Sequence, residues 1–321
     1  MKKWISVSSL LCLSMAAASL AWAQAYPNKP VRLIVPFAPG GGTDVMARQL
    51  GQELAKKLEQ SVLIDNRGGA GGMVGMEAVA HAAPDGYTLL LGQVGQLAIN
   101  PALYPRIAYD PVRDYEPITL VANQPLILVV NPTLPARTVA ELVALSREKP
   151  GKLNFSSAGN GSLSHLAGEL FKSITGAPIV HVPYKGGGPA LLDLVAGQVE
   201  LSFNVIPGVA QHMKAGKLRG LAVSYASPAL PNMPTMAQSG VPGYELGSWF
   251  GILAPARTPQ DLINRLNSDI RATVRSPEIT RVFDEQGVTA IPGTPEEFSR
   301  HIKSELALWS RAVKSSGARV D

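Results

Sequence analysis

The sequence predicts an α/β chain that folds into two lobes, and three observations support this prediction. Short apolar runs bounded by proline and glycine alternate with stretches of helical periodicity. This order is typical of a mostly parallel sheet covered by helices on both faces. A long extended stretch over residues 115–130 and a proline-rich stretch over residues 228–242 divide the alternating units into two groups. We therefore expect lobe 1 to comprise residues 26–124 and 226–321, and lobe 2 to comprise residues 125–225.

Lobe 1 opens with the alternation of strand and helix. Residues 31–35 are a short apolar run before a proline, which is typical of a buried strand. After Gly40-Gly41-Gly42, either Thr43 or Asp44 can cap a helix whose apolar residues recur at helical spacing as far as Leu58. The unit then repeats, so we expect strands at residues 62–64 and 87–91, with a helix between them that ends near Ala82.

Lobe 2 repeats the unit of strand, small-residue loop and helix. Thr138 and Glu141 have the spacing of a capping box at the start of a helix over residues 138–147. A strand at residues 153–156 leads into the loop Gly159-Asn160-Gly161-Ser162, and a helix follows. We expect further strands at residues 179–182, 201–204 and 218–223, then a strand at 250–253 and three helices that return to lobe 1.

The first 25 residues predict a cleaved signal peptide. Met1-Lys2-Lys3 precedes an apolar stretch over residues 4–22, and A-x-A cleavage sites end at Ala23 and Ala25. An uncleaved membrane anchor is the alternative, but several serines dilute the apolar stretch. Cys12, the only cysteine, lies inside this segment, so the chain from residue 26 has no disulfide. We expect export to the periplasm.

The charge balance argues against a nucleic-acid partner. The formal net charge is +5, and loss of Lys2 and Lys3 with the signal peptide lowers it to +3. So small and scattered a charge does not form a nucleic-acid surface, although it favours anionic solutes slightly. No second apolar run approaches membrane length, and a monomer is the expected state.

Two glycine-rich loops are candidate anion sites. A glycine loop before a helix lets a ligand approach the backbone, and the helix dipole favours an anion there. A tight turn without a ligand is the alternative. Neither the dinucleotide fingerprint, which would need glycine at Val45, nor the phosphate loop is present. The candidate residues are Phe37, Ala38, Gly41, Gly42, Thr43 and Asp44 in the first loop, and Ser157, Asn160, Gly161, Ser162 and His165 in the second.

Sequence signals for catalysis and metal binding are weak. No G-x-S-x-G motif is present, and Ser146-Arg147-Glu148-Lys149 matches S-x-x-K without its K-T-G partner. His165 and Glu169 have a spacing that metal sites use, but H-E-x-x-H and a third ligand are missing. We therefore expect no enzyme, no metal and no cofactor. Asp44 with His165 is the one acid and base pair that an enzymatic alternative would use.

Four motifs, in this order and spacing and together with the signal peptide, carry a family resemblance. They are Pro36-Phe37-Ala38-Pro39-Gly40-Gly41-Gly42-Thr43-Asp44, Asp65-Asn66-Arg67-Gly68-Gly69-Ala70-Gly71-Gly72, Gly159-Asn160-Gly161-Ser162-Leu163-Ser164-His165-Leu166 and Val182-Pro183-Tyr184-Lys185-Gly186. They resemble the Bug family, the periplasmic solute-binding receptors of tripartite tricarboxylate transporters. Gly68 stands where that family usually has proline, which alters the rigidity of the loop more than the class of ligand.

The resemblance implies a type II periplasmic-binding-protein fold with a ligand cleft between the two lobes. It implies capture of a small mono- or dicarboxylate, aliphatic or aromatic, for the membrane components of a tripartite tricarboxylate transporter. Residues 37–44 and 157–162 would clamp one carboxylate. The variable end of the solute would face Gly186, Gly187, Asn204 and Trp249. A periplasmic enzyme acting on an organic acid or ester, and a ligand-binding sensor subunit, remain the alternatives.

Overall fold

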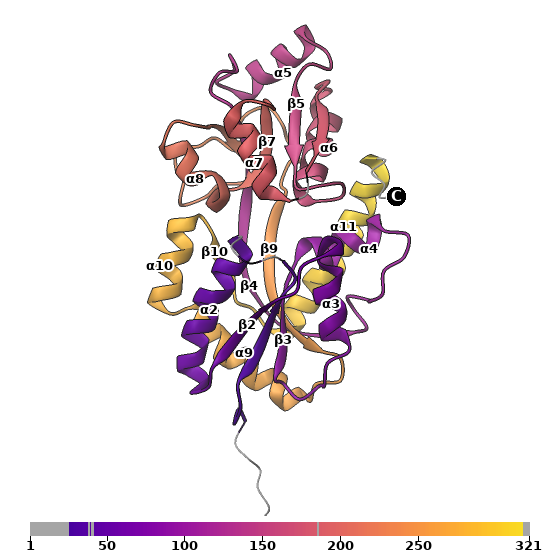
Figure 1. The fold of residues 1–321 in the computed structure, drawn as a ribbon, viewed down its shortest axis with the longest axis vertical. Coiled ribbons are helices and arrows are strands. Elements are labelled where there is room, and N and C mark those ends of the chain that lie inside the picture. Colours follow the sequence, from indigo (N-terminus) through magenta and orange to yellow (C-terminus); the bar gives the residue numbers. More distant parts are fainter. Residues whose placement is uncertain (1–25, 38, 40–41, 185, 317–321) are drawn as a thin grey trace, which may run out of the picture.

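The computed structural model describes residues 26–316 apart from 38, 40, 41 and 185, and shows two lobes stacked along the long axis (Figure 1). The expected signal peptide, including Cys12, lies outside the described residues, as do Ala38 and Gly41. Within the described part, ten strands form one curled sheet in the order β2-β1-β3-β9-β4-β7-β5-β6, and β8 and β10 also pair with β4. This mixed α/β architecture confirms the fold class predicted from the sequence.

The lower lobe in Figure 1 has a sheet with helices on both faces. Its strands are β1 (Val31–Val35), β2 (Val62–Asn66), β3 (Thr88–Gln93), β9 (Gly247–Pro255) and β10 (Thr289–Ala290). Its helices and helical turns are α2 (Gly42–Leu58), η1 (Ala70–Gly72), α3 (Met73–Ala80), η2 (Gly95–Ile99), α4 (Asn100–Leu103), α9 (Gln260–Val274), α10 (Pro277–Gln286) and α11 (Pro295–Ser316). β1 pairs in parallel with β2 and β3, because helices form the crossovers between them.

The upper lobe contains a second group of parallel strands. Its strands are β5 (Asn154–Ser157), β6 (Val180–Pro183), β7 (Leu201–Val205) and β8 (Arg219–Val223). Its helices are α5 (Val139–Glu148), α6 (Leu163–Thr175), α7 (Gly187–Ala196) and α8 (Ile206–Lys214). β5 pairs in parallel with both β6 and β7, as the repeated unit of strand and helix predicted.

One long strand, β4 (Tyr115–Val130), belongs to both lobes. From Tyr115 to Pro125 it pairs with β9, and from Leu126 to Val130 it pairs with β7. The extended stretch expected over residues 115–130 is therefore a single strand, and its partners change in the middle. The chain returns from the upper lobe along the segment between β8 and β9.

The residues of β9 alternate between two hydrophobic clusters on opposite faces of the lower sheet. Phe250 and Ile252 pack with the cluster that includes α2 and α9, whereas Trp249 and Leu253 pack with the cluster that includes α11. Gly251 lies between them. Within the described residues, no helix is both long enough and apolar enough to cross a membrane.

The capping box predicted for α5 leads to a testable expectation. Thr138 Oγ1 accepts a hydrogen bond from the Glu141 amide at 3.2 Å, and the Glu141 carboxylate accepts from the Arg137 amide at 2.6 Å. Changing Thr138 to alanine should lower the free energy of unfolding by about 1 kcal/mol, because an amide in the first turn loses its acceptor. Thr138→Ser should retain most of the stability in chemical denaturation. Equal losses in both variants would contradict the capping role.

Candidate functional site

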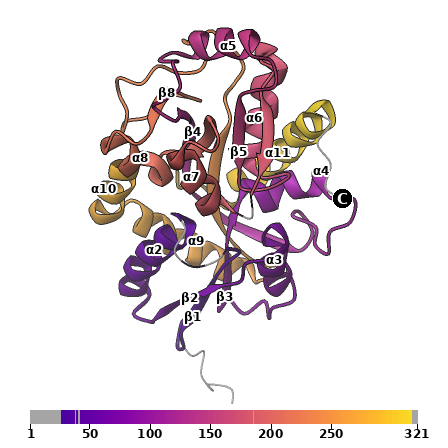
Figure 2. The same cartoon turned by 45° about the horizontal axis from the view of Figure 1, so that its top comes forward.

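The strand directions bring the two glycine-rich loops to the junction of the lobes. β1 and β3 run in the direction of β4, because β9 is antiparallel to both β3 and β4. β5, β6 and β7 run the opposite way, since β7 is antiparallel to β4. The carboxyl ends of the two groups of strands therefore point toward each other. Figures 1 and 2 both place α7 of the upper lobe opposite the start of α2.

Thr43 lies in the first turn of α2, and its hydroxyl oxygen accepts a hydrogen bond from the protein. Gln93, the last residue of β3, donates its side-chain amide to Thr43 Oγ1 at 2.6 Å. A hydroxyl that already accepts still has one proton to donate, so Thr43 can offer a hydrogen bond to an anion. The N-terminus of a 17-residue helix adds a favourable dipole at the same place.

Side-chain hydrogen bonds fix Phe37 and Asp44 at the two ends of the first loop. Asp44 is buried and its Oδ2 accepts from Arg48 Nε at 3.0 Å, an i,i+4 pair along α2. Arg48 also contacts Asn66 Oδ1 at 3.3 Å, and Asn66 donates to the carbonyl oxygen of Phe37 at 3.2 Å. The Asp44 carboxylate therefore supports the loop through Arg48.

In the second loop, three backbone amides donate within the loop itself. Gly159 N donates to Ser157 Oγ at 3.1 Å, Gly161 N donates to His165 Nδ1 at 3.0 Å, and Ser162 N donates to Gly159 O at 3.1 Å. The sequence had suggested that these amides would serve an anion directly. Hydroxyl and side-chain amide groups are left to do so: Ser162 caps α6, and Asn160 is exposed.

A stacked pair of histidines supports this loop from inside the upper lobe. The His165 and His181 rings are 4.0 Å apart at 19°, and His181 Nε2 lies 2.6 Å from Ser157 Oγ. Burial lowers the pKa of both, and burial together with neighbouring His165 lowers the pKa of His181 to about 4. Because His165 Nδ1 accepts from Gly161, the proton of its neutral ring is on Nε2. The pair is therefore uncharged at neutral pH.

The β6–α7 connection lies beside the second loop. A Cβ on Gly159 would lie 3.0 Å from Tyr184 O, so the two loops are in close contact. Gly186 caps α7 with φ 122°, and a side chain there or at Gly187 would meet open space. Gly186 and Gly187 are thus placed where the backbone of α7 is accessible.

Asn204 reaches the same region from β7, but Trp249 does not. Asn204 donates to Ser202 Oγ at 2.9 Å, and Ser202 donates to the carbonyl oxygen of Ser156 at 3.0 Å, next to the second loop. The Trp249 indole lies on the α11 face of β9, where it donates to Glu305 at 2.8 Å. Thr43 and Gln93 lie on the other face. Asp44 accepts from Arg48 on its own helix, and His165 Nδ1 accepts from Gly161 in the upper lobe.

Two polar residues beside the loops were missed by the motif search. Gln93 and His181 belong to no motif, and His181 carried no signal of its own in the sequence. Both lie at or near the carboxyl end of a predicted parallel strand, where ligand contacts of α/β sheets are found. Strand-end position was therefore the signal that could have identified them.

Solved structures define the class of protein. The structure is similar to a Rhodopseudomonas palustris protein, Rpa4515 with adipate, at a TM-score of 0.87 and 38% identity, covering 92% of this chain and 100% of that one. It is also similar to the periplasmic binding protein BugD at 0.84 and 34%, covering 92% and 99%. The MatC protein of the same R. palustris, with bound malate, matches at 0.82 and 31%, covering 90% and 100%. The fold is that of a two-lobed periplasmic solute-binding protein.

Sequence comparison then identifies the family. The model of the TctC family, the tripartite tricarboxylate transporter family receptors, matches residues 46–318. The BugT protein of Bordetella pertussis is 38% identical over 323 residues, covering 100% of this chain and 99% of the relative. The chain belongs to the TctC family of solute-binding receptors, as the Bug resemblance predicted. The family and the structural neighbours are receptors and not enzymes.

Proposed function

We propose that this receptor captures a small carboxylate between its lobes and delivers it to the membrane components of a tripartite tricarboxylate transporter. The observation that carries the proposal is that the strands before α2 and α6 point toward each other at the junction of the lobes, and that each helix has a hydroxyl in its first turn or at its cap. Relatives with bound adipate and bound malate support a carboxylate as the solute. Secretion through a cleaved signal peptide at residues 1–25 is part of the proposal.

The carboxylate would be held by hydrogen bonds and helix dipoles rather than by a buried cation. Thr43 and Ser162 each accept a hydrogen bond from the protein. Thr43 retains a proton to donate, and Ser162 does so when Ser164, 3.1 Å away, is the donor of the bond between their hydroxyls. Charge-assisted hydrogen bonds contribute about 1.5–3 kcal/mol each, so three or four approach the roughly 8 kcal/mol of a micromolar complex. The accessible backbone around Gly186 and Gly187, with Asn204, would contact the other end of the solute.

Capture would be completed by closure of the lobes. We assign residues 26–124 and 226–321 to one lobe and residues 125–225 to the other, because the partner of β4 changes from β9 to β7 within one residue of this boundary. Closure would bend β4 and the return segment, as in other hinge motions. Both loops would then contact one ligand, and the closed form would dock on the membrane partner.

Binding measurements on residues 26–321 test the clamp. Calorimetry with malate, adipate, benzoate and citrate should identify the solute class, and chromatography should recover the ligand intact. Thr43→Ala and Ser162→Ala should each weaken binding of the best ligand about tenfold, which corresponds to the loss of one hydrogen bond to a charged group. Thr43→Ser should bind nearly as well as the natural protein.

Exposed hydroxyls provide the controls. Thr280→Ala in α10 and Ser310→Ala in α11 should leave the affinity unchanged, since both residues are exposed and belong to neither loop. Unchanged affinity in both Thr43→Ala and Ser162→Ala would exclude these loops as the clamp. Consumption of the ligand would exclude a simple receptor.

A further inference from the structure

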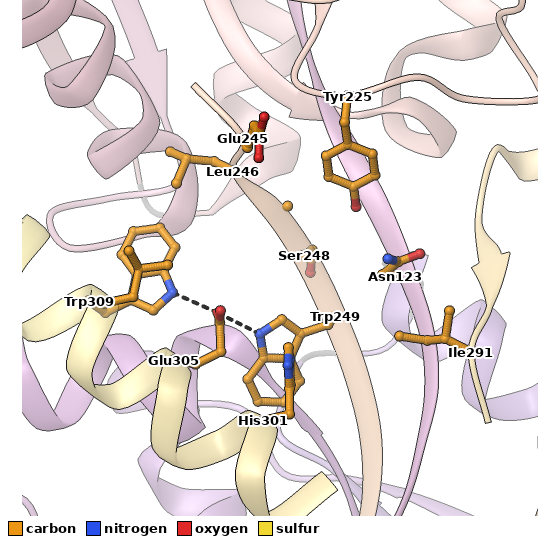
Figure 3. Close-up of a pocket in the computed structure, with 12 residues that line it drawn as sticks. Asn123, Tyr225, Glu245, Leu246, Ser248, Trp249, Ile291, His301, Glu305 and Trp309 are labelled. Atoms are coloured by element: carbon orange, nitrogen blue, oxygen red, sulfur yellow. Dashed lines mark hydrogen bonds between the residues drawn. The ribbon is translucent and has the colours of Figure 1, made fainter. Parts of the chain in front are cut away.

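A pocket of about 160 Å³ lies behind the strands that join the lobes, on the α11 face of β9 (Figure 3). Asn123 of β4 and residues 247–249 of β9 form one side, Tyr225 of the return segment forms another, and His301, Glu305 and Trp309 of α11 close it. The volume equals roughly five water molecules, enough for a ligand of a few heavy atoms. It shares no residue with the glycine-rich loops.

The charged groups of this pocket are all acidic. Glu245 and Glu305 line it, and no lysine or arginine is among its lining residues. Glu305 Oε2 accepts from Trp249 Nε1 at 2.8 Å and from Trp309 Nε1 at 3.0 Å, so two neutral donors hold the carboxylate in place. In the part of the chain that the structure describes, neither glutamate forms an ion pair.

Two buried polar atoms of the pocket have no hydrogen-bond partner among the described residues. They are Asn123 Oδ1 and His301 Nε2. The Asn123 oxygen can only accept, and a buried acceptor without a donor carries a desolvation penalty of about 1–3 kcal/mol. Burial also lowers the pKa of His301, so its ring is neutral and adds no positive charge.

Three aromatic side chains complete the walls. The rings of Tyr225, Trp249 and Trp309 surround the same space, with the two indole nitrogens directed at Glu305 (Figure 3). Aromatic faces attract ammonium groups, and tryptophan does so most strongly. Two carboxylates and aromatic walls are complementary to one class of ligand, a cation that carries N–H groups and a short apolar part.

We propose that this pocket is a second binding site, specific for a small primary ammonium compound and separate from the carboxylate site. The pocket draws its walls from β4 and from the return segment between β8 and β9, so its occupant would contact the hinge directly. The proposal does not depend on which solute the glycine-rich loops bind.

The chain contains its own reporter for this site. Beyond residue 25 the only tryptophans are Trp249 and Trp309, so the tryptophan emission of residues 26–321 comes entirely from this pocket. Titration with n-butylammonium chloride should change the emission saturably, whereas sodium chloride at equal ionic strength should not. Tetramethylammonium, which has no N–H donor for the carboxylates of Glu245 and Glu305, should bind at least tenfold more weakly.

Variants that each remove one carboxylate charge from the pocket test whether it binds an ammonium compound. Glu305→Gln keeps a side-chain oxygen for both indoles, and Glu245→Gln changes an exposed residue, so each removes mainly a charge. Both should weaken butylammonium binding at least tenfold, while Glu285→Gln on the exposed side of α10 should not. The proposal would be overturned if butylammonium chloride changed the emission no more than sodium chloride does. It would also be overturned if both variants bound butylammonium with the affinity of the natural protein. If Glu305→Gln fails to fold, Glu245→Gln decides alone.

Discussion

Replacing Gly168 with alanine should lower the free energy of unfolding by about 2 kcal/mol, because the new methyl group has no space. Gly168 is buried in α6, and a Cβ at this position would overlap the ring of Phe155 in β5. Phe155 cannot move aside easily: it is fully buried, with the His181 ring 4.9 Å away on one side and the Phe203 ring 6.2 Å away on another. The overlap outweighs the better helix propensity of alanine, which is worth about 1 kcal/mol.

A second helical glycine provides the matched control. Gly208 in α8 is exposed, and a Cβ there would lie 4.0 Å from the Val205 side chain, an ordinary contact. Gly208→Ala should therefore be neutral or slightly stabilising in chemical denaturation. If both alanine variants shifted stability equally, the close packing of α6 on Phe155 would not be the cause. Since Phe155 also contacts His181 beneath the second loop, Gly168→Ala should weaken carboxylate binding as well.

The parts of the fold that follow from local signals could be predicted from the sequence. The strands bounded by proline and glycine and the capping box at Thr138 appear where expected. The three helices expected after the last strand also form, and α9 begins directly after Pro259 and α11 at Pro295. The helix expected to continue to Ala82 ends at Ala80. Boundaries differ by such amounts because tertiary contacts decide the last turn.

Elements that depend on tertiary contacts could not be predicted in this way. The two-residue strand β10 exists only because it pairs with Asn123 and Ala122 of β4. The helical turn η2 continues directly into α4, where a proline stands in the first turn. α8 begins with Ile206-Pro207-Gly208, which in sequence is more typical of a turn than of a helix.

The candidate site shows the same division between local and tertiary signals. The glycine-rich loops could be found because they combine glycine with a helix start in consecutive residues. Gln93 and His181 could not, because only the pairing of parallel strands brings them to the loops. Trp249 was expected to face the solute, but the alternation of side chains along β9 directs its indole to α11. Only the register of β9 decides that direction.

The stacked histidines should make the protein lose stability as the pH falls from 6.5 to 4. Burial and neighbouring His165 lower the pKa of His181 to about 4 in the folded state, whereas an unfolded chain has the ordinary value near 6.5. Below pH 6.5 the unfolded state therefore binds a proton that the folded state does not. The stability is fully present above pH 6.5 and declines as the pH approaches 4. The difference corresponds to up to about 3 kcal/mol.

His165 and His301 add to this dependence in the same direction, because burial lowers the pKa of each. The charges of Glu169 and Lys172, which pair at 2.9 Å, act on the pKa of His165 in opposite directions, and burial is the largest cause of its lowering. Urea denaturation at several pH values between 7.5 and 4.5 should show the decline. His181→Gln keeps a polar partner for Ser157 without a titrating ring, and should flatten the pH dependence. The exposed His81→Gln variant should keep the natural dependence of the unfolding free energy on pH. If His181→Gln also kept it, the buried histidine pair would not be the cause of that dependence.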